Sequence, residues 1–167
     1  MIRGLVIRPA EERDREAIRA LLDASFGGPA EGDLVERLLR DGDAVLELVA
    51  TQEAEVVGHV LFSRLRVEGE HSSFDAVALA PLAAQRVRQR TGIGTALVEN
   101  AHHMLEEAGE KLSVVLGDPA YYGRFGYEHA RAEAFDSDYQ GEALQALAWG
   151  KAPATGRLVY ARAFAEL

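Results

Sequence analysis

The sequence predicts an α/β domain built on a mixed sheet, and three observations support this class. Strand-like and helix-like apolar patterns alternate along the chain. Three strand-like runs follow one another between Val45 and Ala83 with short polar turns between them, which is typical of an antiparallel meander. The longest helical pattern lies between two apolar strands, as in a right-handed crossover between parallel strands. Since the 167 residues contain no linker-like stretch, we expect one domain over residues 1–167.

The N-terminal third predicts one strand and two helices. Leu5–Arg8 has the pattern of a short strand, and Asp14 is a candidate N-cap for the helix that follows. The loop "SFGGPAEG" leads to a second helix that ends at Gly42. One face of the first helix carries Ala17, Ile18, Leu21 and Leu22, and one face of the second carries Leu34, Val35, Leu38 and Leu39.

The middle third predicts the meander and the crossover. Its strands are "VLELVAT" from Val45, "VVGHVLFSRLRV" from Val56 and "SFDAVALAPLA" from Ser73. The longest helix follows, Gly109 ends it, and "LSVVLG" reads as a buried strand parallel to the third strand of the meander. The apolar face of this helix consists of Ile93, Ala96, Leu97, Ala101, Met104, Leu105 and Ala108.

The C-terminal third predicts one short helix and two closing strands. Asp118 and Pro119 supply an N-cap and a favoured first residue for the turn "AYYGRF", which Gly126 closes. The segments "EALQALAW" and "GRLVYARAF" have the pattern of two antiparallel strands. The acidic stretch from Glu128 to Gly141 is irregular, and no element is predicted there.

Composition restricts the class of protein. Apolar residues make up 48% of the chain and charged residues 27%, as in ordinary globular proteins. The net charge of −9 argues against nucleic acid as the main partner and favours a cationic substrate. The absence of cysteine excludes disulfides, thiolate zinc sites and a cysteine nucleophile, so we expect an intracellular, cytoplasmic protein. The first residues contain no apolar stretch that suits a signal sequence or a membrane span.

The stretch "RVRQRTGIGTALV" from Arg86 to Val98 predicts a phosphate site. Gly92 and Gly94 let the backbone approach a ligand, and the first N–H groups of the following helix have no intrahelical partner. A P-loop is excluded because Gly150-Lys151 is followed by alanine, and the dinucleotide fingerprint would need glycine at Leu97. The pattern that remains is Q-x-x-G-x-G, from Gln89 to Gly94.

These residues resemble the GNAT superfamily of N-acetyltransferases, whose acetyl-CoA signature is R/Q-x-x-G-x-G/A at the start of a helix. The segment "ALAPLAAQRVRQRTGIGTALV" is similar to the family's strand, loop and helix, and "YYGRFGY" to its later tyrosine-containing segment. The order of elements also fits, and "GDPAYYGRFGY" with "GRLVYARAF" resembles a bacterial subgroup of predicted acetyltransferases. The resemblance implies a mostly antiparallel mixed sheet with helices on both faces and a central βαβ crossover.

The resemblance also implies a cofactor, acetyl-CoA, and the residues that bind it. Backbone groups of the turn would hold the pyrophosphate, and Arg86, Arg88 and Arg90 could add positive charge. The backbone of Leu82, Ala83 and Ala84 would pair with the pantetheine arm and polarise the thioester carbonyl. The turn comprises Gln89, Arg90, Thr91, Gly92, Ile93, Gly94 and Thr95.

In the same family a tyrosine protonates the departing CoA thiolate, and here that position corresponds to Tyr122, with Tyr121 as the nearby alternative. The acceptor would be a primary amine of a small molecule or a protein, and a homodimer through the closing strands is possible. The base that deprotonates the amine stays open between Glu31, His59 and Asp75.

Two other functions are compatible with parts of this sequence or commonly occur on α/β domains. An acyl-CoA-binding sensor or interaction module without turnover is the alternative function, and an esterase is disfavoured because no serine stands in G-x-S-x-G. No metal site is expected, since the adjacent His102 and His103 point about 100° apart on a helix.

Overall fold

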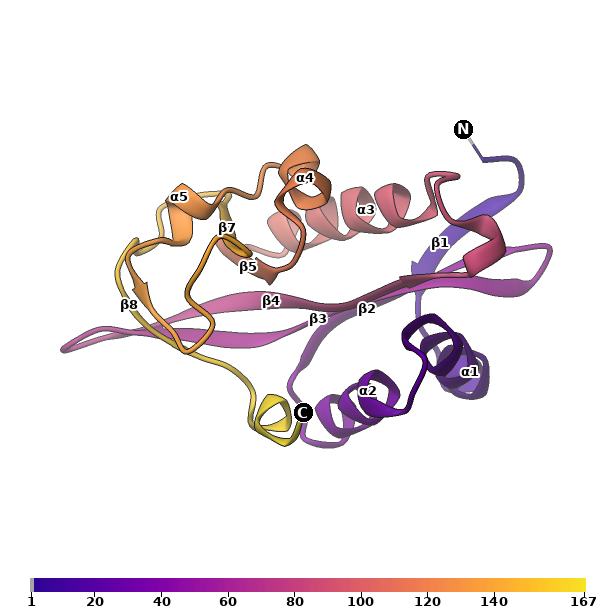
Figure 1. Ribbon diagram of the computed structural model, residues 1–167, viewed down its shortest axis with the longest axis horizontal. Helices are drawn as coiled ribbons and strands as arrows, with labels where there is room; N and C mark the ends of the chain where they lie inside the picture. The colour runs from indigo at the N-terminus through magenta and orange to yellow at the C-terminus, as the bar shows by residue number, and fades with distance from the viewer. Residues whose placement is uncertain (1) are drawn as a thin grey trace.

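A computed structural model describes residues 2–167, and a mixed sheet of eight strands forms its centre (Figure 1). The strands lie in the order β1-β2-β3-β4-β5-β7, and β8 pairs with both β3 and β6. Neighbouring strands are antiparallel except in the pairs β4–β5 and β6–β8. The bounds are β1 Leu5–Pro9, β2 Ala44–Gln52, β3 Glu55–Glu68, β4 Ser73–Ala84, β5 Leu112–Leu116, β6 Phe135–Asp136, β7 Leu144–Ala148 and β8 Gly156–Val159.

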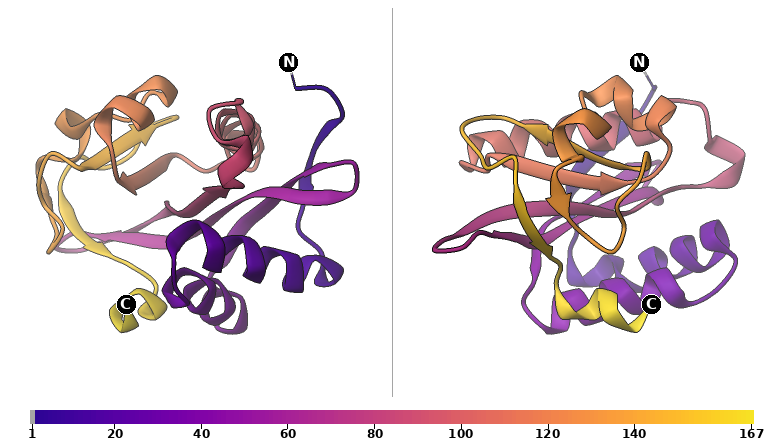
Figure 2. Two further views of the ribbon diagram at one scale, coloured as in Figure 1. Left: turned by 45° about the vertical axis from the view of Figure 1, so that its right-hand side comes forward. Right: turned by 60° about the vertical axis from the view of Figure 1, so that its left-hand side comes forward.

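Helices cover both faces of the sheet. The helices α1 (Arg15–Phe26) and α2 (Ala30–Arg40) lie on one face together with the C-terminal 3₁₀ turn Arg162–Glu166. The long helix α3 (Ile93–Glu107) and the short helix α4 (Pro119–Tyr122) lie on the other face (Figure 2). None of the helices formed by residues 2–167 has the length and apolar character that a membrane-spanning helix requires.

A separate apolar cluster fills the space on each side of the sheet. Phe62 of β3 packs with Leu97 and Ala101 of α3, whereas Leu61 packs on the opposite face with Leu22 of α1 and Leu38 of α2. Each large aliphatic or aromatic side chain buried in this way stabilises the fold by about 1.5–3 kcal/mol. Because the Leu61 and Phe62 side chains point to opposite faces of β3, helices on both sides of the sheet pack against the same strand.

The pairing between β4 and β5 is short, and this opens the sheet. The two parallel strands pair only between Val77–Leu79 and Ser113–Val115. Beyond that point, β4 continues through Leu82–Ala84, where it pairs with β3 on its other edge. Among the described residues, the β5-facing edge of Leu82–Ala84 has no strand partner, and α3 begins beside this gap.

The predicted fold class is confirmed, including the strand and two helices at the start, the meander, and the crossover helix between parallel strands. Three expectations at the C-terminal end are wrong. The closing strands do not pair with each other, because β7 adds to β5 and β8 adds to β3. The segment from Gly156 leaves the sheet after Val159, and the stretch Glu128–Gly141 contains α5 (His129–Ala132) as well as β6.

The predicted cap of α1 also differs in its contacts. Asp14 precedes Arg15 as expected, but its carboxylate accepts no hydrogen bond from an N–H group of α1. It accepts instead from the Arg8 guanidinium at 2.7 and 2.9 Å and from the N–H group of Glu11 at 2.8 Å. The hydrogen bond from Arg8 lowers the pKa of Asp14 to about 2. Asp14 therefore connects β1 to the turn before α1, because a nearby arginine competes for its oxygens.

Candidate active site

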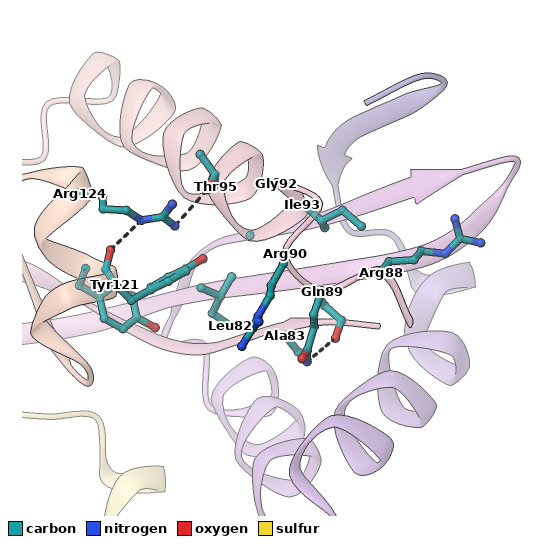
Figure 3. A pocket seen from close by; sticks show the side chains of 13 residues that line it. Leu82, Ala83, Arg88, Gln89, Arg90, Gly92, Ile93, Thr95, Tyr121 and Arg124 are labelled. Carbon is teal, nitrogen blue, oxygen red and sulfur yellow. Dashed lines mark hydrogen bonds between the residues drawn. The ribbon is translucent and has the colours of Figure 1, made fainter. Parts of the chain in front are cut away.

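A pocket of about 660 Å³ lies where β4 ends, α3 begins and α4 passes over the sheet (Figure 3). Nine of the ten residues that the sequence assigns to cofactor binding line it, and so does Tyr122. The exception is Thr91, whose hydroxyl donates to the Arg88 carbonyl within the loop. The pocket brings together Leu82, Ala83, Ala84, Gln89, Arg90, Gly92, Ile93, Gly94, Thr95 and Tyr122, and three further residues, Arg88, Tyr121 and Arg124.

The start of α3 presents unpaired N–H groups to this pocket. Gly92 adopts a left-handed conformation with φ of 94°, and the first intrahelical bond runs from the Ala96 N–H group to the Gly92 carbonyl at 2.9 Å. The N–H groups from Gly92 to Thr95 donate to no acceptor within residues 2–167. A helix start of this kind binds anions, because several N–H dipoles point the same way.

The side chains of the loop arginines diverge. Arg90 extends across the pocket toward Leu82, whereas Arg88 points away from it (Figure 3) and donates to Gln52 and Gln85. Arg86 lines a different hollow, beside α1. Of the three arginines proposed to supplement the turn, Arg90 is therefore the one with its guanidinium placed over the pocket.

Arg124 is a site residue that the sequence reasoning missed. Its guanidinium lies 4.6 Å from the centroid of the Tyr121 ring and donates to the Thr95 hydroxyl at 3.1 Å. A cation thus lies at the pocket rim beside the first turn of α3. The arginine inside the quoted segment "YYGRFGY" was the available signal, but its direction depends on how α4 packs against α3.

The neighbouring tyrosines have different surroundings. The Tyr121 hydroxyl packs so closely against Gly94 that a Cβ atom there would collide with it. The Tyr122 ring packs against Gly117 at the end of β5, where a Cβ atom would lie 2.6 Å from the ring. Both glycines are therefore needed for the close approach of a tyrosine.

Tyr122 can act as a proton or hydrogen-bond donor. Burial raises the pKa of its hydroxyl to about 12, so it is protonated at neutral pH. Its ring stands nearly perpendicular to the rings of Tyr121 and Tyr127, with centroids 5.0 and 6.0 Å away. Within the described chain the hydroxyl forms no hydrogen bond, which leaves it available to a ligand.

A second pocket of about 370 Å³ adjoins the first and shares Leu82 and Tyr122 with it. It lies between the ends of β4 and β5, the corner joining α1 and α2, and the C-terminal 3₁₀ turn. Tyr122 therefore stands where two pockets meet, one beside the N–H groups of α3 and one walled by α1 and α2.

Of the three candidate bases, only Glu31 lines one of these two pockets. It lines the second pocket and belongs to the first turn of α2, whereas the sequence placed it in a loop. His59 is fully buried and lines neither pocket, since its Nε2 atom bonds to Glu47 at 2.8 Å. Asp75 is exposed on β4 opposite Arg66 and also lies outside both pockets.

Glu47 is paired on two sides beneath α1. Burial opposes its charge, but hydrogen bonds from His59 and Arg15 outweigh this effect and keep the pKa of Glu47 below its usual value. His59 is thus part of a buried hydrogen-bonded cluster with Glu47 and Arg15. Residues 2–167 contain no group of three or more histidine, cysteine or acidic side chains arranged to hold a metal ion.

Comparison with known proteins agrees with this geometry. The family described as "Acetyltransferase (GNAT) domain" matches residues 6–130. The uncharacterized N-acetyltransferase YhbS of Escherichia coli K12 is 42% identical over 127 residues, which cover 75% of each chain. The crystal structure of Escherichia coli YhbS in complex with CoA matches with a TM-score of 0.88 and 35% identity, over 97% of this chain and 92% of that one. A GNAT family acetyltransferase from Brucella melitensis in complex with acetyl-CoA matches with a TM-score of 0.82 and 30% identity, over 96% and 97% of the two chains.

Proposed function

Because the chain belongs to the GNAT family of acetyltransferases, we propose that its larger pocket binds acetyl-CoA and that the adjoining pocket receives the amine to be acetylated. The activity is N-acetyl transfer from acetyl-CoA, as the family and its solved relatives with CoA and acetyl-CoA support. One observation carries the assignment of the pockets. The unpaired N–H groups of Gly92–Thr95 open into a pocket that leads to Tyr122.

The N-terminus of α3 suits the diphosphate of the coenzyme. The helix dipole contributes about 0.3–1 kcal/mol for an anion at an exposed N-terminus. Each hydrogen bond from an N–H group to a charged oxygen contributes about 1.5–3 kcal/mol, so the aligned N–H groups of Gly92–Thr95 should outweigh the dipole. The guanidinium groups of Arg90 and Arg124 add positive charge at the pocket.

The open edge of β4 suits the remainder of the coenzyme. The backbone of Leu82–Ala84 has no strand partner on the side facing β5, although the Ala84 carbonyl accepts a hydrogen bond from the Gln89 side chain at 3.4 Å, and the pantetheine arm can pair there as a further strand would. Acetyl-CoA supplies the thioester whose acetyl group passes to the amine nitrogen. A backbone N–H group on this edge is placed to stabilise negative charge on the carbonyl oxygen.

Tyr122 assists the departure of the thiol. Its hydroxyl is protonated at neutral pH and donates a hydrogen bond to the sulfur as the carbon–sulfur bond breaks. The pKa of about 12 lies above the value of about 8.5 that is usual for a thiol, so complete proton transfer from Tyr122 is uphill. We therefore expect a moderate contribution to the rate.

The acceptor must lose a proton before it attacks. A primary amine with a pKa near 10.4 is neutral in about one molecule in 2,500 at pH 7. Glu31 is the only acidic side chain among the lining residues of the second pocket in the described chain. We propose that Glu31 binds the ammonium form and receives its proton, directly or through water.

Two variants of adjacent tyrosines test this function. Acetyl-CoA should bind the wild-type protein in a calorimetric titration, and amines should then release free thiol. Tyr122→Phe should lower kcat roughly 10- to 100-fold and leave the dissociation constant for acetyl-CoA within about twofold, because only the hydroxyl is removed. Tyr121→Phe is the matched control and should retain most of kcat.

Each other outcome has a distinct meaning. Failure to bind acetyl-CoA would reject the pocket assignment. Binding without thiol release from any amine would indicate an acyl-CoA-binding module. A loss of kcat in Tyr121→Phe but not in Tyr122→Phe would exchange the roles of the two residues.

The extent and assembly of the protein complete the proposal. We propose that residues 1–167 act as one N-acetyltransferase domain, because all eight strands join in one sheet. We also propose that this domain acts in the cytoplasm. A homodimer through the closing strands would have to use β7, since β8 already lies between β3 and β6. Sedimentation velocity measures this state directly.

A further inference from the structure

The walls of the second pocket are mainly apolar. Phe26 of α1, Leu116 of β5 and Tyr139 contribute to them although 44%, 50% and 43% of their surfaces are exposed. Large apolar side chains exposed together around one hollow mark a binding surface, because covering them stabilises a complex by about 25 cal/mol per Å². An occupant with an apolar body would gain this free energy, whereas a strongly hydrated occupant would not.

The aromatic rings at one end of the pocket form a connected wall. Tyr160 lies between Tyr139 and Phe164, with ring centroids 5.4 and 5.5 Å away. Burial raises the pKa of Tyr160 to about 12, so this wall has no negative charge at neutral pH. Rings held at steep angles to one another present both faces and edges, which suits the packing of a further ring.

One charged side chain interrupts the apolar lining. Glu31 is the only charged side chain among the pocket residues of the described chain, and its carboxylate can attract a single ammonium group. A polyamine would place its remaining charges against apolar walls, at a large desolvation cost. The lining therefore matches an occupant with one amino group.

The size and the scarcity of polar groups favour a small molecule over a peptide. The volume of about 370 Å³ lies at the lower end of the range for small-ligand pockets, roughly 300–1,000 Å³. The polar side chains in the lining are Glu31 and three tyrosines, Tyr122, Tyr139 and Tyr160. A peptide backbone would have to bury several amide groups with few partners, which costs free energy for each group left unpaired.

We propose that the acceptor is a small primary amine with an apolar, ring-containing body, bound with its amino group near Glu31 and its ring against Phe26 and Tyr139. This inference rests on the proposed function, and it specifies the substrate class. In the reaction the ammonium group gives one proton to Glu31 or to water, and the neutral nitrogen forms a bond to the acetyl carbon. The carbon–sulfur bond breaks, the nitrogen loses its second proton, and the sulfur gains a proton, so that an N-alkylacetamide and free CoA thiol result.

A panel of amines tests the substrate class. Thiol release should be measured at saturating acetyl-CoA with 2-phenylethylamine, tryptamine and hexylamine, and with ethanolamine, spermidine and a lysine-containing peptide. We expect kcat/KM for 2-phenylethylamine to exceed the values for ethanolamine, spermidine and the peptide by at least tenfold. A preference for spermidine or the peptide over all three apolar amines overturns the inference and leaves the acetyltransferase function intact.

Variants of the wall locate the ring. Phe26→Ser should raise KM for 2-phenylethylamine at least fivefold, while KM for ethanolamine and the dissociation constant for acetyl-CoA change less than twofold. Met104→Ser is the matched control, because Met104 is a partly exposed apolar residue of α3 that lines none of the described pockets. If Phe26→Ser does not fold, Tyr139→Ser provides the same comparison. An unchanged KM for 2-phenylethylamine in the folded variant overturns the placement.

Direct binding separates this inference from the proposed function. Calorimetry should show that 2-phenylethylamine binds to the protein saturated with CoA, and that Glu31→Gln weakens this binding at least fivefold. If the amine binds in this way but no thiol is released, the catalytic function fails and the pocket specificity stands. If acetyl-CoA is bound and turned over with polar amines while 2-phenylethylamine does not bind at millimolar concentration, the specificity fails and the function stands.

Discussion

Gly117 determines where the ring of Tyr122 can lie. The residue directly follows β5, and it has no side chain at the point where the Tyr122 ring packs against the backbone. A Cβ atom at this position would lie 2.6 Å from one ring carbon and 3.1 Å from another. These separations are shorter than a van der Waals contact, so the ring must move if a methyl group is added.

We expect Gly117→Ala to lower kcat roughly 10- to 100-fold, because a displacement of about 1 Å can misplace a reacting group. The dissociation constant for acetyl-CoA should change little, since the N–H groups of α3 are untouched. Gly123→Ala is the control, because Gly123 has a helical backbone and open space around its Cα atom. Steady-state kinetics measure kcat for both variants, and equal kcat values would contradict the role of Gly117.

At the scale of elements, α3 combines packing and binding at different positions. Its apolar face packs against β2 and β3 through residues such as Leu97 and Ala101. The Ile93 side chain in its first turn belongs to the same packing, whereas a left-handed Gly92 turns the loop so that the next backbone N–H groups face the pocket. Because a left-handed backbone conformation is strained for residues with a side chain, position 92 favours glycine.

Substitutions of two glycines at opposite ends of α3 can distinguish an effect on cofactor binding from an effect of backbone strain on folding stability. Gly92 and Gly109 have φ values of 94° and 93°, and a Cβ atom would collide with nothing at either position. Valine at either position should cost roughly 1–3 kcal/mol of folding stability through backbone strain. Only Gly92→Val should also abolish calorimetric binding of acetyl-CoA, because it reshapes the anion site. Loss of binding in Gly109→Val, or retained binding in Gly92→Val, would argue against the role of this helix start.

A group of hydrogen bonds from one arginine holds the corner between α1 and α2 in place. The Arg19 guanidinium donates to Asp23, Asp33 and Glu36, and these hydrogen bonds raise the pKa of Arg19. The corner carries Phe26 and Glu31, the two residues on which the proposed acceptor specificity most depends. The shape of the proposed acceptor pocket thus depends on contacts between helices that lie far from α3.

At the scale of the whole molecule, a half-buried histidine connects α3 to the C-terminal part of the sheet. The Nε2 atom of His102 lies 2.9 Å from the Tyr127 hydroxyl, which in turn lies 2.7 Å from the hydroxyl of Ser113 on β5. Phe62, Trp149 and Phe125 surround the imidazole. Burial among these rings lowers the pKa of His102 to about 4, well below the usual value of 6.5.

This pKa predicts how folding stability depends on pH. The unfolded chain binds a proton at His102 below pH 6.5, whereas the folded chain stays neutral there until about pH 4. Stability is therefore fully present above pH 6.5 and falls as the pH is lowered toward 4, by on the order of 1–2 kcal/mol. Thermal melting at pH 7 and pH 5 should show this loss. It should be smaller in His102→Gln and unchanged in His103→Gln, whose imidazole is exposed and paired with Glu107.

The sequence determined the order of most elements, since apolar periodicity, caps and glycines are local signals. The run around Gly92 and Gly94 could be interpreted as an anion site because those residues act through their own backbone. The partners of β7 and β8 could not be predicted in this way, because strand pairing is a contact between distant segments and many pairings satisfy the same pattern.

The tertiary structure alone decided which side chains share a pocket. It placed Glu31 and Tyr122 in the lining of the same pocket and kept His59 and Asp75 out of it, although the sequence offered all three on equal terms. It also turned Arg124 toward Thr95 and assembled the mainly apolar second pocket, the proposed acceptor site, from α1, α2, β5 and the C-terminal turn. The physical reason is that side-chain position depends on how helices pack across the sheet, and the local sequence specifies only which face of each element is apolar.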